Sequence, residues 1–203
     1  MLILRSSPAS PFGRKIKIAA SVLGLEENLS IELADTNSPT DSLRQQNPLG
    51  KIPAMITEDD TVLYDSRVIT EYLDFISEHK KILPSDASRF ELLTKQALAD
   101  GICDAAILLV VEKRVRPQEK WFDGWLNYQQ EKIDRALTTF ENGPLHFVAH
   151  NSPDAAQIAL ACALGYLDLR FEGKWRESYP NLLKWLNDFE AAVPSFEATR
   201  MQP

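Results

Sequence analysis

The chain has 203 residues, of which 44% are hydrophobic and 25% charged, and its formal net charge is −7. This composition is typical of a globular protein with apolar residues for one large core or two modest ones, so it excludes a largely disordered chain. The acidic balance argues against nucleic acid as a partner, because phosphate backbones select basic surfaces.

Two cysteines, Cys103 and Cys162, fall in helix-like segments and form no Cys-x-x-Cys pair. Two cysteines are too few for a disulfide scaffold, so we interpret both as small buried residues in a reducing compartment. The apolar run at 2–4 is too short for a signal peptide, and the longest apolar run, 105–111, is too short to cross a bilayer. We therefore expect a cytoplasmic protein with no membrane partner.

The first third of the chain alternates between strand and helix patterns. Ser10-Pro11 predicts a helix start, because serine is a good N-cap and proline at the first helical position loses no hydrogen bond. Gly24 predicts the end of that helix. We interpret three basic residues near its start as a solvated face: Arg14, Lys15 and Lys17.

Short apolar or alternating runs predict four strands, at 2–4, 29–33, 52–57 and 62–64, of which the last two form a hairpin. A helix follows the hairpin. Its apolar side is predicted to consist of Val68, Ile69, Tyr72, Leu73 and Ile76. The order βαβ and then ββα can be accommodated in one sheet.

Residues 79–88 are polar and contain a proline, which is typical of a linker. Beyond them we find only helical periodicity, with helices predicted at 89–115 and 118–141. A capping box, Asp154 to Gln157, opens a third helix, and Leu182, Leu183, Leu186 and Phe189 mark a fourth. The pattern predicts an α/β domain over 1–78 and an all-helical domain over 89–203.

Three stretches, taken together, resemble the cytosolic glutathione transferase family. They are Ser10-Pro11-Phe12-Gly13-Arg14-Lys15, Asn47-Pro48-Leu49-Gly50-Lys51-Ile52-Pro53 and Tyr64-Asp65-Ser66-Arg67-Val68-Ile69. Residues 159–167 also resemble the buried sixth helix of that family. The resemblance covers nearly the whole chain and is greatest to small bacterial members with a Ser-Pro-Phe start. It implies a thioredoxin-like N-terminal domain that holds glutathione, an all-helical C-terminal domain and a homodimer.

The stretch Lys51-Ile52-Pro53 is implied by the resemblance to bind the backbone of glutathione. In the family the proline is cis, and Ile52 would then pair with the cysteinyl unit as an added strand does. The alternative is that Pro53 only starts an edge strand with a trans bond.

Asp65 and Ser66 are implied to hold the γ-glutamyl end of glutathione. Ser66 and the free N–H groups of a helix start can bind its carboxylate, and Asp65 can accept from its ammonium. The alternative is that one of them is an ordinary N-cap. In the family an acidic residue of the partner subunit often meets the ammonium. Asp100 and Asp104 are candidates for that role, or else belong to a solvated helix face or an internal ion pair.

Ser10 is the catalytic candidate. A hydroxyl just before a helix start can donate to a thiolate, and the helix N-terminus adds positive potential. The alternative is a plain N-cap. By resemblance the second-substrate pocket would lie between the Ser10 loop and the first helix of the second domain. Its candidate residues, which could equally be ordinary core, are Pro8, Phe12, Ile107 and Val111.

The predicted function is conjugation of glutathione, as a co-substrate, to small electrophiles, as in detoxification. Two alternatives stay open: a non-catalytic interaction or regulatory module of the same fold, and a glutathione-dependent peroxidase or thiol reductase. Position 10 is serine and not cysteine, which argues against a mixed-disulfide mechanism. We expect no metal, because the His146 and His150 pair lacks a supporting ligand pattern.

Overall fold

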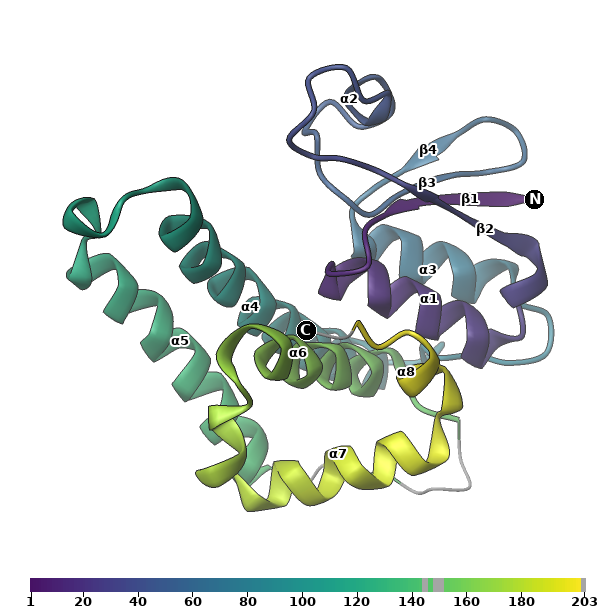
Figure 1. Cartoon of the computed structure of the whole chain (residues 1–203). Helices are drawn as coiled ribbons and strands as arrows, with labels where there is room; N and C mark the ends of the chain where they lie inside the picture. The colour runs from purple at the N-terminus through teal and green to yellow at the C-terminus, as the bar shows by residue number, and fades with distance from the viewer. Residues whose placement is uncertain (144–145, 148–151, 202–203) are drawn as a thin grey trace.

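The computed structural model describes residues 1–143, 146–147 and 152–201. The N-terminal part consists of β1 (Leu2–Ser6), α1 (Pro11–Leu23), the 3₁₀ turn η1 (Glu26–Asn28), β2 (Leu29–Leu33), α2 (Leu43–Gln46), β3 (Ala54–Ile56), β4 (Val62–Leu63) and α3 (Ser66–Ile76). The strands form one mixed sheet in the order β2-β1-β3-β4, in which β1 and β2 are parallel and the other pairs antiparallel. Helices α1 and α3 lie together on one face of this sheet (Figure 1).

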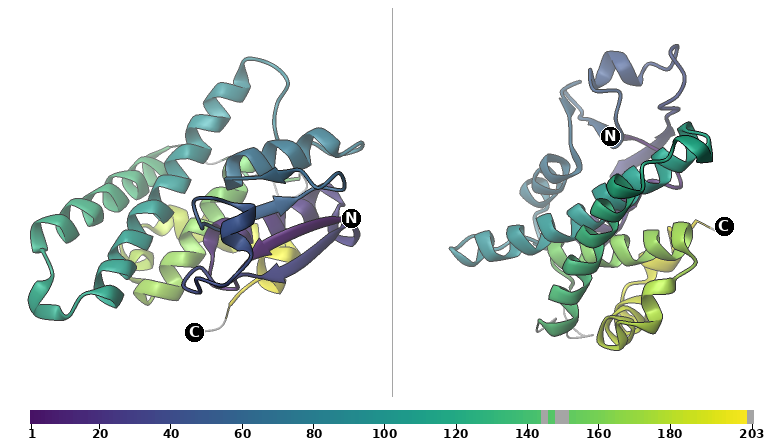
Figure 2. Two further views of the ribbon diagram at one scale, coloured as in Figure 1. Left: turned by 90° about the horizontal axis from the view of Figure 1, so that it is seen from above. Right: turned by 90° about the vertical axis from the view of Figure 1, so that its left-hand side faces the viewer.

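The C-terminal part, as far as it is described, contains only helices. They are α4 (Ser88–Val115), η2 (Gln118–Lys120), α5 (Asp123–Asn142), α6 (Ala155–Phe171), η3 (Lys174–Glu177), α7 (Pro180–Ala192) and α8 (Pro194–Ala198). The long helices α4 and α5 form an antiparallel pair, and α6 packs against both α4 and α1 (Figures 1 and 2). This architecture confirms the prediction of a thioredoxin-like domain followed by a helical domain. Within the described ranges, no helix has the length and hydropathy needed to span a bilayer.

The predicted helix ends are confirmed by their hydrogen bonds. The Ser10 hydroxyl accepts from the Gly13 N–H at 3.1 Å, and Gly24 ends α1 in the left-handed conformation with φ 76°. At the start of α6, Asp154 and Gln157 form the predicted capping box. The second helix of this part begins at Asp123 and not at 118, because residues after Pro117 form the separate turn η2. The hairpin strands are also shorter than predicted.

The interpretation of the basic residues of α1 as a solvated face was wrong for two of them. The exposed fraction of Arg14 is 7% and that of Lys15 is 1%. Both are buried because α1 is covered by the sheet on one side and by α6 on the other. On α3, Val68 is exposed, so it does not belong to the buried side that was predicted for that helix.

The segment predicted as a linker is held firmly by backbone hydrogen bonds. Ile82 and Leu83 are buried, and their N–H groups donate to Asp74 Oδ1 at 2.7 and 3.1 Å. The Ile82 carbonyl accepts from the N–H of Ala155 at 3.0 Å, which ties the segment to the start of α6. Whether a domain boundary falls at 79–88 stays a prediction.

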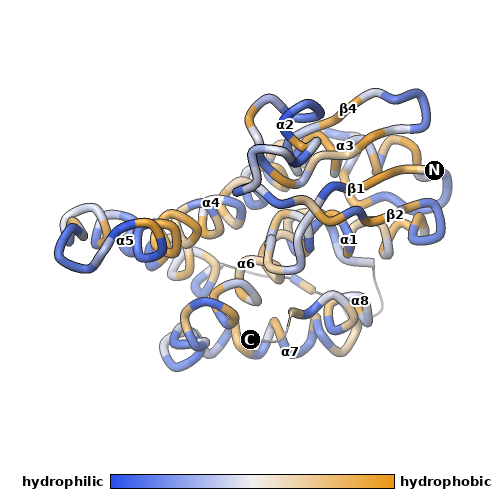
Figure 3. The backbone as a smooth tube through the Cα atoms, turned by 45° about the horizontal axis from the view of Figure 1, so that its top comes forward, coloured by the Kyte–Doolittle hydropathy of each residue, from blue (hydrophilic) through white to orange (hydrophobic). Residues whose placement is uncertain are grey.

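Figure 3 shows β1 changing from hydrophobic to hydrophilic along its length. The hydrophilic part contains Arg5, which is nevertheless buried. Its guanidinium donates to Ser42 Oγ and Gln46 Oε1 at 2.7 Å and to Asp41 Oδ1 at 2.8 Å. These bonds attach α2 to the sheet and so fix the start of the Asn47–Pro53 stretch.

Candidate functional site

Ser10 lies where the end of β1 meets the start of α1. Its hydroxyl oxygen accepts one N–H, from Gly13, and this leaves the hydroxyl proton available for donation to another group. A Cβ at position 13 would lie 1.9 Å from Ser6 Oγ, so a larger residue there would force the Ser6 side chain to move. Because Ser10 is the N-cap of α1, the positive end of this helix lies directly beside the Ser10 hydroxyl.

The Asn47–Pro53 stretch presents the backbone of Ile52. The Ile52–Pro53 peptide bond is cis, as the resemblance implied. Asn47 is buried, its Nδ2 donates to the Lys51 carbonyl at 2.8 Å, and its Oδ1 accepts from the Leu49 N–H at 3.0 Å. Neither the N–H nor the C=O of Ile52 has a hydrogen-bond partner within the described ranges. Both groups can therefore pair with an extended peptide.

Asp65 and Ser66 form the start of α3. Asp65 is the N-cap, with Oδ1 accepting from the Arg67 N–H at 2.9 Å, and its peptide bond to Tyr64 is cis. Ser66 is the first helical residue and is buried, and its hydroxyl makes no hydrogen bond to any residue that the structure describes. The N-cap role is confirmed for Asp65. It is compatible with anion binding at the same helix start.

A buried ion pair joins the N-terminal part to α4. The ammonium of Lys15 lies 2.7 and 2.9 Å from the two carboxylate oxygens of Asp100, and Arg67 Nε lies 3.2 Å from Asp100 Oδ2. Burial lowers the pKa of Arg67, but Asp100 outweighs this effect and leaves that pKa above its ordinary value. The internal ion pair, one of the alternatives for Asp100, is therefore what the structure contains. The Asp104 side chain is 60% exposed and stays a candidate for contact across a dimer.

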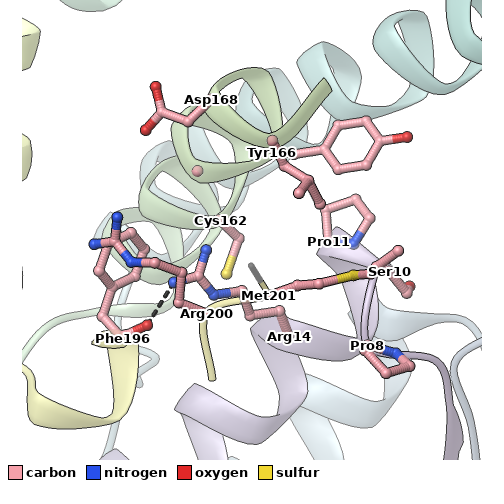
Figure 4. A pocket seen from close by; sticks show the side chains of 13 residues that line it. Pro8, Ser10, Pro11, Arg14, Cys162, Tyr166, Asp168, Phe196, Arg200 and Met201 are labelled. Carbon is pink, nitrogen blue, oxygen red and sulfur yellow. Dashed lines mark hydrogen bonds between the residues drawn. The ribbon is translucent and has the colours of Figure 1, made fainter. Parts of the chain in front are cut away.

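A cavity of about 280 Å³ lies between the Ser10 loop, α6 and the last described residues (Figure 4). Pro8, Ser10 and Pro11 line it, and Tyr166 of α6 faces it from the helical domain, whereas the pocket was predicted to lie against the first helix of that domain. The role of Pro8 in binding a second substrate stays a prediction. The other predicted pocket residues do not line this cavity. Phe12 and Ile107 pack against the core and Val111 is half-buried, so their assignment to a second-substrate pocket stays a prediction.

Neither cysteine is a reactive thiol. Cys162 borders the cavity, but burial raises its pKa to about 11, so the thiol stays protonated at neutral pH. Burial raises the pKa of Cys103 as well. The described residues bring together no group of three or more side chains that could hold a metal ion, and His150 lies outside those residues.

Sequence reasoning missed the roles of Lys15 and Arg67. Lys15 lies at helical spacing from Ile18, Ala19 and Val22, which are apolar, so this periodicity could have shown that it is buried. Arg67 directly follows the Asp65-Ser66 pair, but nothing local indicates its partner on α4. The contribution of α6 and the C-terminal residues to the cavity had no sequence signal either.

Comparison with known proteins agrees with this geometry. The chain matches the family models of the glutathione S-transferase N-terminal domain over residues 9–75 and C-terminal domain over residues 96–188. It is 35% identical to the uncharacterized GST-like protein YibF of Escherichia coli over 189 residues, which cover 89% of this chain and 90% of that protein.

Solved structures of relatives extend over the full chain. A glutathione transferase family member from Pseudomonas fluorescens Pf-5, crystallised with bound glutathione, has 39% identity, a TM-score of 0.91 and 100% coverage of both chains. A structure of that protein with bound S-(propanoic acid)-glutathione has 38% identity, a TM-score of 0.87 and the same coverage. The two domain matches and these relatives show that the chain belongs to the glutathione S-transferase family.

Proposed function

We propose that this protein conjugates the thiol of glutathione to small electrophiles, with Ser10 as the hydrogen-bond donor to the thiolate. The observation that carries the proposal is the position of the Ser10 hydroxyl, which caps α1 and keeps its proton free beside the positive helix end. The relative from Pseudomonas fluorescens was solved with bound glutathione, which supports glutathione as the ligand.

The tripeptide would be held at two further places. The free N–H and C=O of Ile52, beside Lys51 and Pro53, would pair with its backbone. The start of α3, with Asp65 and Ser66, would bind the γ-glutamyl end, where helix N–H groups favour a carboxylate. Because Asp100 is already held by Lys15, Asp104 of a partner subunit is the better candidate for the ammonium in the homodimer that we propose.

Magnitudes limit what Ser10 can contribute. A charge-assisted hydrogen bond is worth about 1.5–3 kcal/mol, which corresponds to roughly one to two pKa units. Lowering a thiol pKa from about 8.5 to about 6.5 raises the thiolate fraction at pH 7 from about 3% to about 75%. The less basic thiolate is also a weaker nucleophile, so the net gain is only a few-fold. Most of the acceleration would come from holding the electrophile beside the sulfur.

The two cysteines of this chain do not support a thiol-reductase mechanism that uses a protein thiolate. Such a mechanism needs an accessible thiolate to form the mixed disulfide. Position 10 is serine, and Cys103 and Cys162 are buried with raised pKa values.

Two measurements test the proposal together. Calorimetric titration of glutathione should give a dissociation constant between micromolar and millimolar, about −8 to −4 kcal/mol. Turnover with 1-chloro-2,4-dinitrobenzene, an electrophile that gives a coloured conjugate, should exceed the uncatalysed rate. Absence of binding at several millimolar glutathione would contradict the proposal, and binding without turnover of any electrophile would favour an interaction module.

A further inference from the structure

Arg14 is a buried arginine whose contacts are all uncharged. Its Nε donates to Thr199 Oγ1 at 3.2 Å, its Nη2 donates to the Phe196 carbonyl, and its guanidinium carbon lies 4.0 Å from the centre of the Phe196 ring. Within the described ranges, no carboxylate oxygen lies within 4.0 Å of this guanidinium. A buried charge with no opposite charge in contact is costly, and burial lowers the pKa of Arg14.

The nearest carboxylates are held by another residue. Glu190 and Glu197 act on Arg14 only at longer range, and both form ion pairs with Arg200. Asp168, which also borders the cavity, is paired with Arg176 at 2.7 Å. The acidic groups around the cavity, among the residues that the structure describes, are thus occupied, and none of them contacts Arg14.

The remaining terminal nitrogen of Arg14, Nη1, lies against Gly165, which borders the cavity. Nη1 has no acceptor among the described residues, and a Cβ built on Gly165 would lie 2.4 Å from it. Arg14, Gly165 and Cys162 all border the cavity. Figure 4 shows the Arg14 guanidinium between Cys162 and Phe196, with Ser10 and Pro8 on the opposite side. The cavity therefore has the Ser10 hydroxyl at one end and, at the other, a guanidinium that no described carboxylate contacts.

We propose that Arg14 binds a carboxylate carried by the second substrate, so that the preferred electrophiles are those with an acidic group. The proposal rests on the proposed function, since it places the reacting carbon near the sulfur at Ser10 and the carboxylate at Arg14. A guanidinium is the side chain best suited to a carboxylate, and hydrogen bonds between the two charged groups are the strong ones. The apolar surfaces of Pro8, Pro11 and Tyr166 would contact the body of the substrate between these ends.

The first test uses the unmodified protein and three ligands: glutathione, S-benzylglutathione and S-(4-carboxybenzyl)glutathione. The last two differ by a single carboxylate. We expect the carboxylate to tighten binding about tenfold or more in calorimetry, as for a charge-assisted hydrogen bond. Equal or weaker binding of the carboxybenzyl ligand would overturn this inference. Failure of glutathione itself to bind would instead contradict the proposed function.

Variants then assign the preference to Arg14. Arg14→Met should abolish the tighter binding of S-(4-carboxybenzyl)glutathione, while the affinity for S-benzylglutathione stays unchanged. Lys17 lies on the same helix but does not border the cavity. Lys17→Met removes an equal charge and should therefore leave the preference for the carboxybenzyl ligand intact. If Arg14→Met does not fold, Gly165→Ala is the second variant, because its added carbon displaces Nη1 and should reduce the preference. Gly101→Ala on α4 is its control, because the added carbon meets no neighbouring element within 4 Å, and it should leave the preference unchanged. A full preference in Arg14→Met or Gly165→Ala would overturn the assignment.

Discussion

Lys15 of α1 and Asp100 of α4 form a buried ion pair, with the ammonium 2.7 and 2.9 Å from the two carboxylate oxygens. The exposed fractions of the two residues are 1% and 2%, so the buried Lys15 charge depends on Asp100 for compensation. The pair joins the helix that Ser10 caps to the first long helix of the other domain. Arg67, next to Ser66, contacts the same carboxylate, so one carboxylate links both proposed glutathione-binding helices.

Removing one partner of this pair should be strongly destabilising. We expect Asp100→Leu to lower the free energy of unfolding by about 3–5 kcal/mol, because it leaves the buried Lys15 ammonium alone. Lys15→Met should cost less, because Arg67 still contacts the Asp100 carboxylate. The double variant should lose much less than the sum of the two, and denaturant unfolding measures all three. The matched control is the exposed pair of Lys184 and Asp188, also 2.7 Å apart, where Lys184→Met should cost about 1 kcal/mol or less. Additive losses in the double variant would contradict the coupling.

The buried Cys162 should make stability depend on pH in the alkaline range. Its pKa is raised from 9.0 to about 11 by burial, so between these values the unfolded chain releases a proton that the folded protein keeps. The free energy of unfolding should therefore be unaffected by this group below about pH 9 and fall as the pH rises towards 11. Cys162→Ala should flatten that part of the curve. Rapid alkylation of native Cys162 by iodoacetamide at pH 7 would contradict the burial on which this depends.

Much of this fold follows from local signals in the sequence. Ser10, Gly24 and Asp154 are capping residues in the positions where helices start or end, because caps depend on neighbours in the chain. The cis bond before Pro53 came from family resemblance and had no basis in the residues alone.

What could not be predicted depends on residues far apart in the sequence. Lys15 meets Asp100 across 85 positions and Arg14 meets Phe196 across 182, and no local pattern indicates either partner. The polar segment at 79–88 is fixed by the Asp74 carboxylate, which no composition rule would reveal. The cavity is completed by α6 and the C-terminal residues, so its lining could not be read from the Ser10 motif.

Ser66→Ala should weaken glutathione binding by about 1–3 kcal/mol, because it removes a donor from the proposed γ-glutamyl site. Calorimetric titration measures the change. Ser88→Ala is the matched control, since Ser88 is also the first residue of a helix but belongs to α4. Unchanged affinity in Ser66→Ala would show that the γ-glutamyl end binds elsewhere, although the fold assignment would stand.

Ser10→Ala separates the capping role of this residue from its proposed chemical role. Loss of the N-cap hydrogen bond to Gly13 should lower the free energy of unfolding by about 1 kcal/mol in either case. If the hydroxyl also donates to the thiolate, the thiol pKa of bound glutathione should rise by about one to two units. Thiolate absorbs in the far ultraviolet, so a pH titration of the complex measures that pKa directly, while denaturant unfolding measures the stability.

Ser7→Ala is the control, because Ser7 lies in the same loop and its hydroxyl makes no hydrogen bond within the described residues. Ser7→Ala should change neither the free energy of unfolding nor the thiol pKa of bound glutathione. Ser10→Cys adds a second probe: a cysteine at the start of α1 should gain thiolate character from the helix end and form mixed disulfides with glutathione. If Ser10→Ala lost stability but left the thiol pKa within about 0.3 units of the unmodified protein, Ser10 would be a helix cap only. Activation of the sulfur would then have to come from the backbone N–H groups and the positive end of α1 alone.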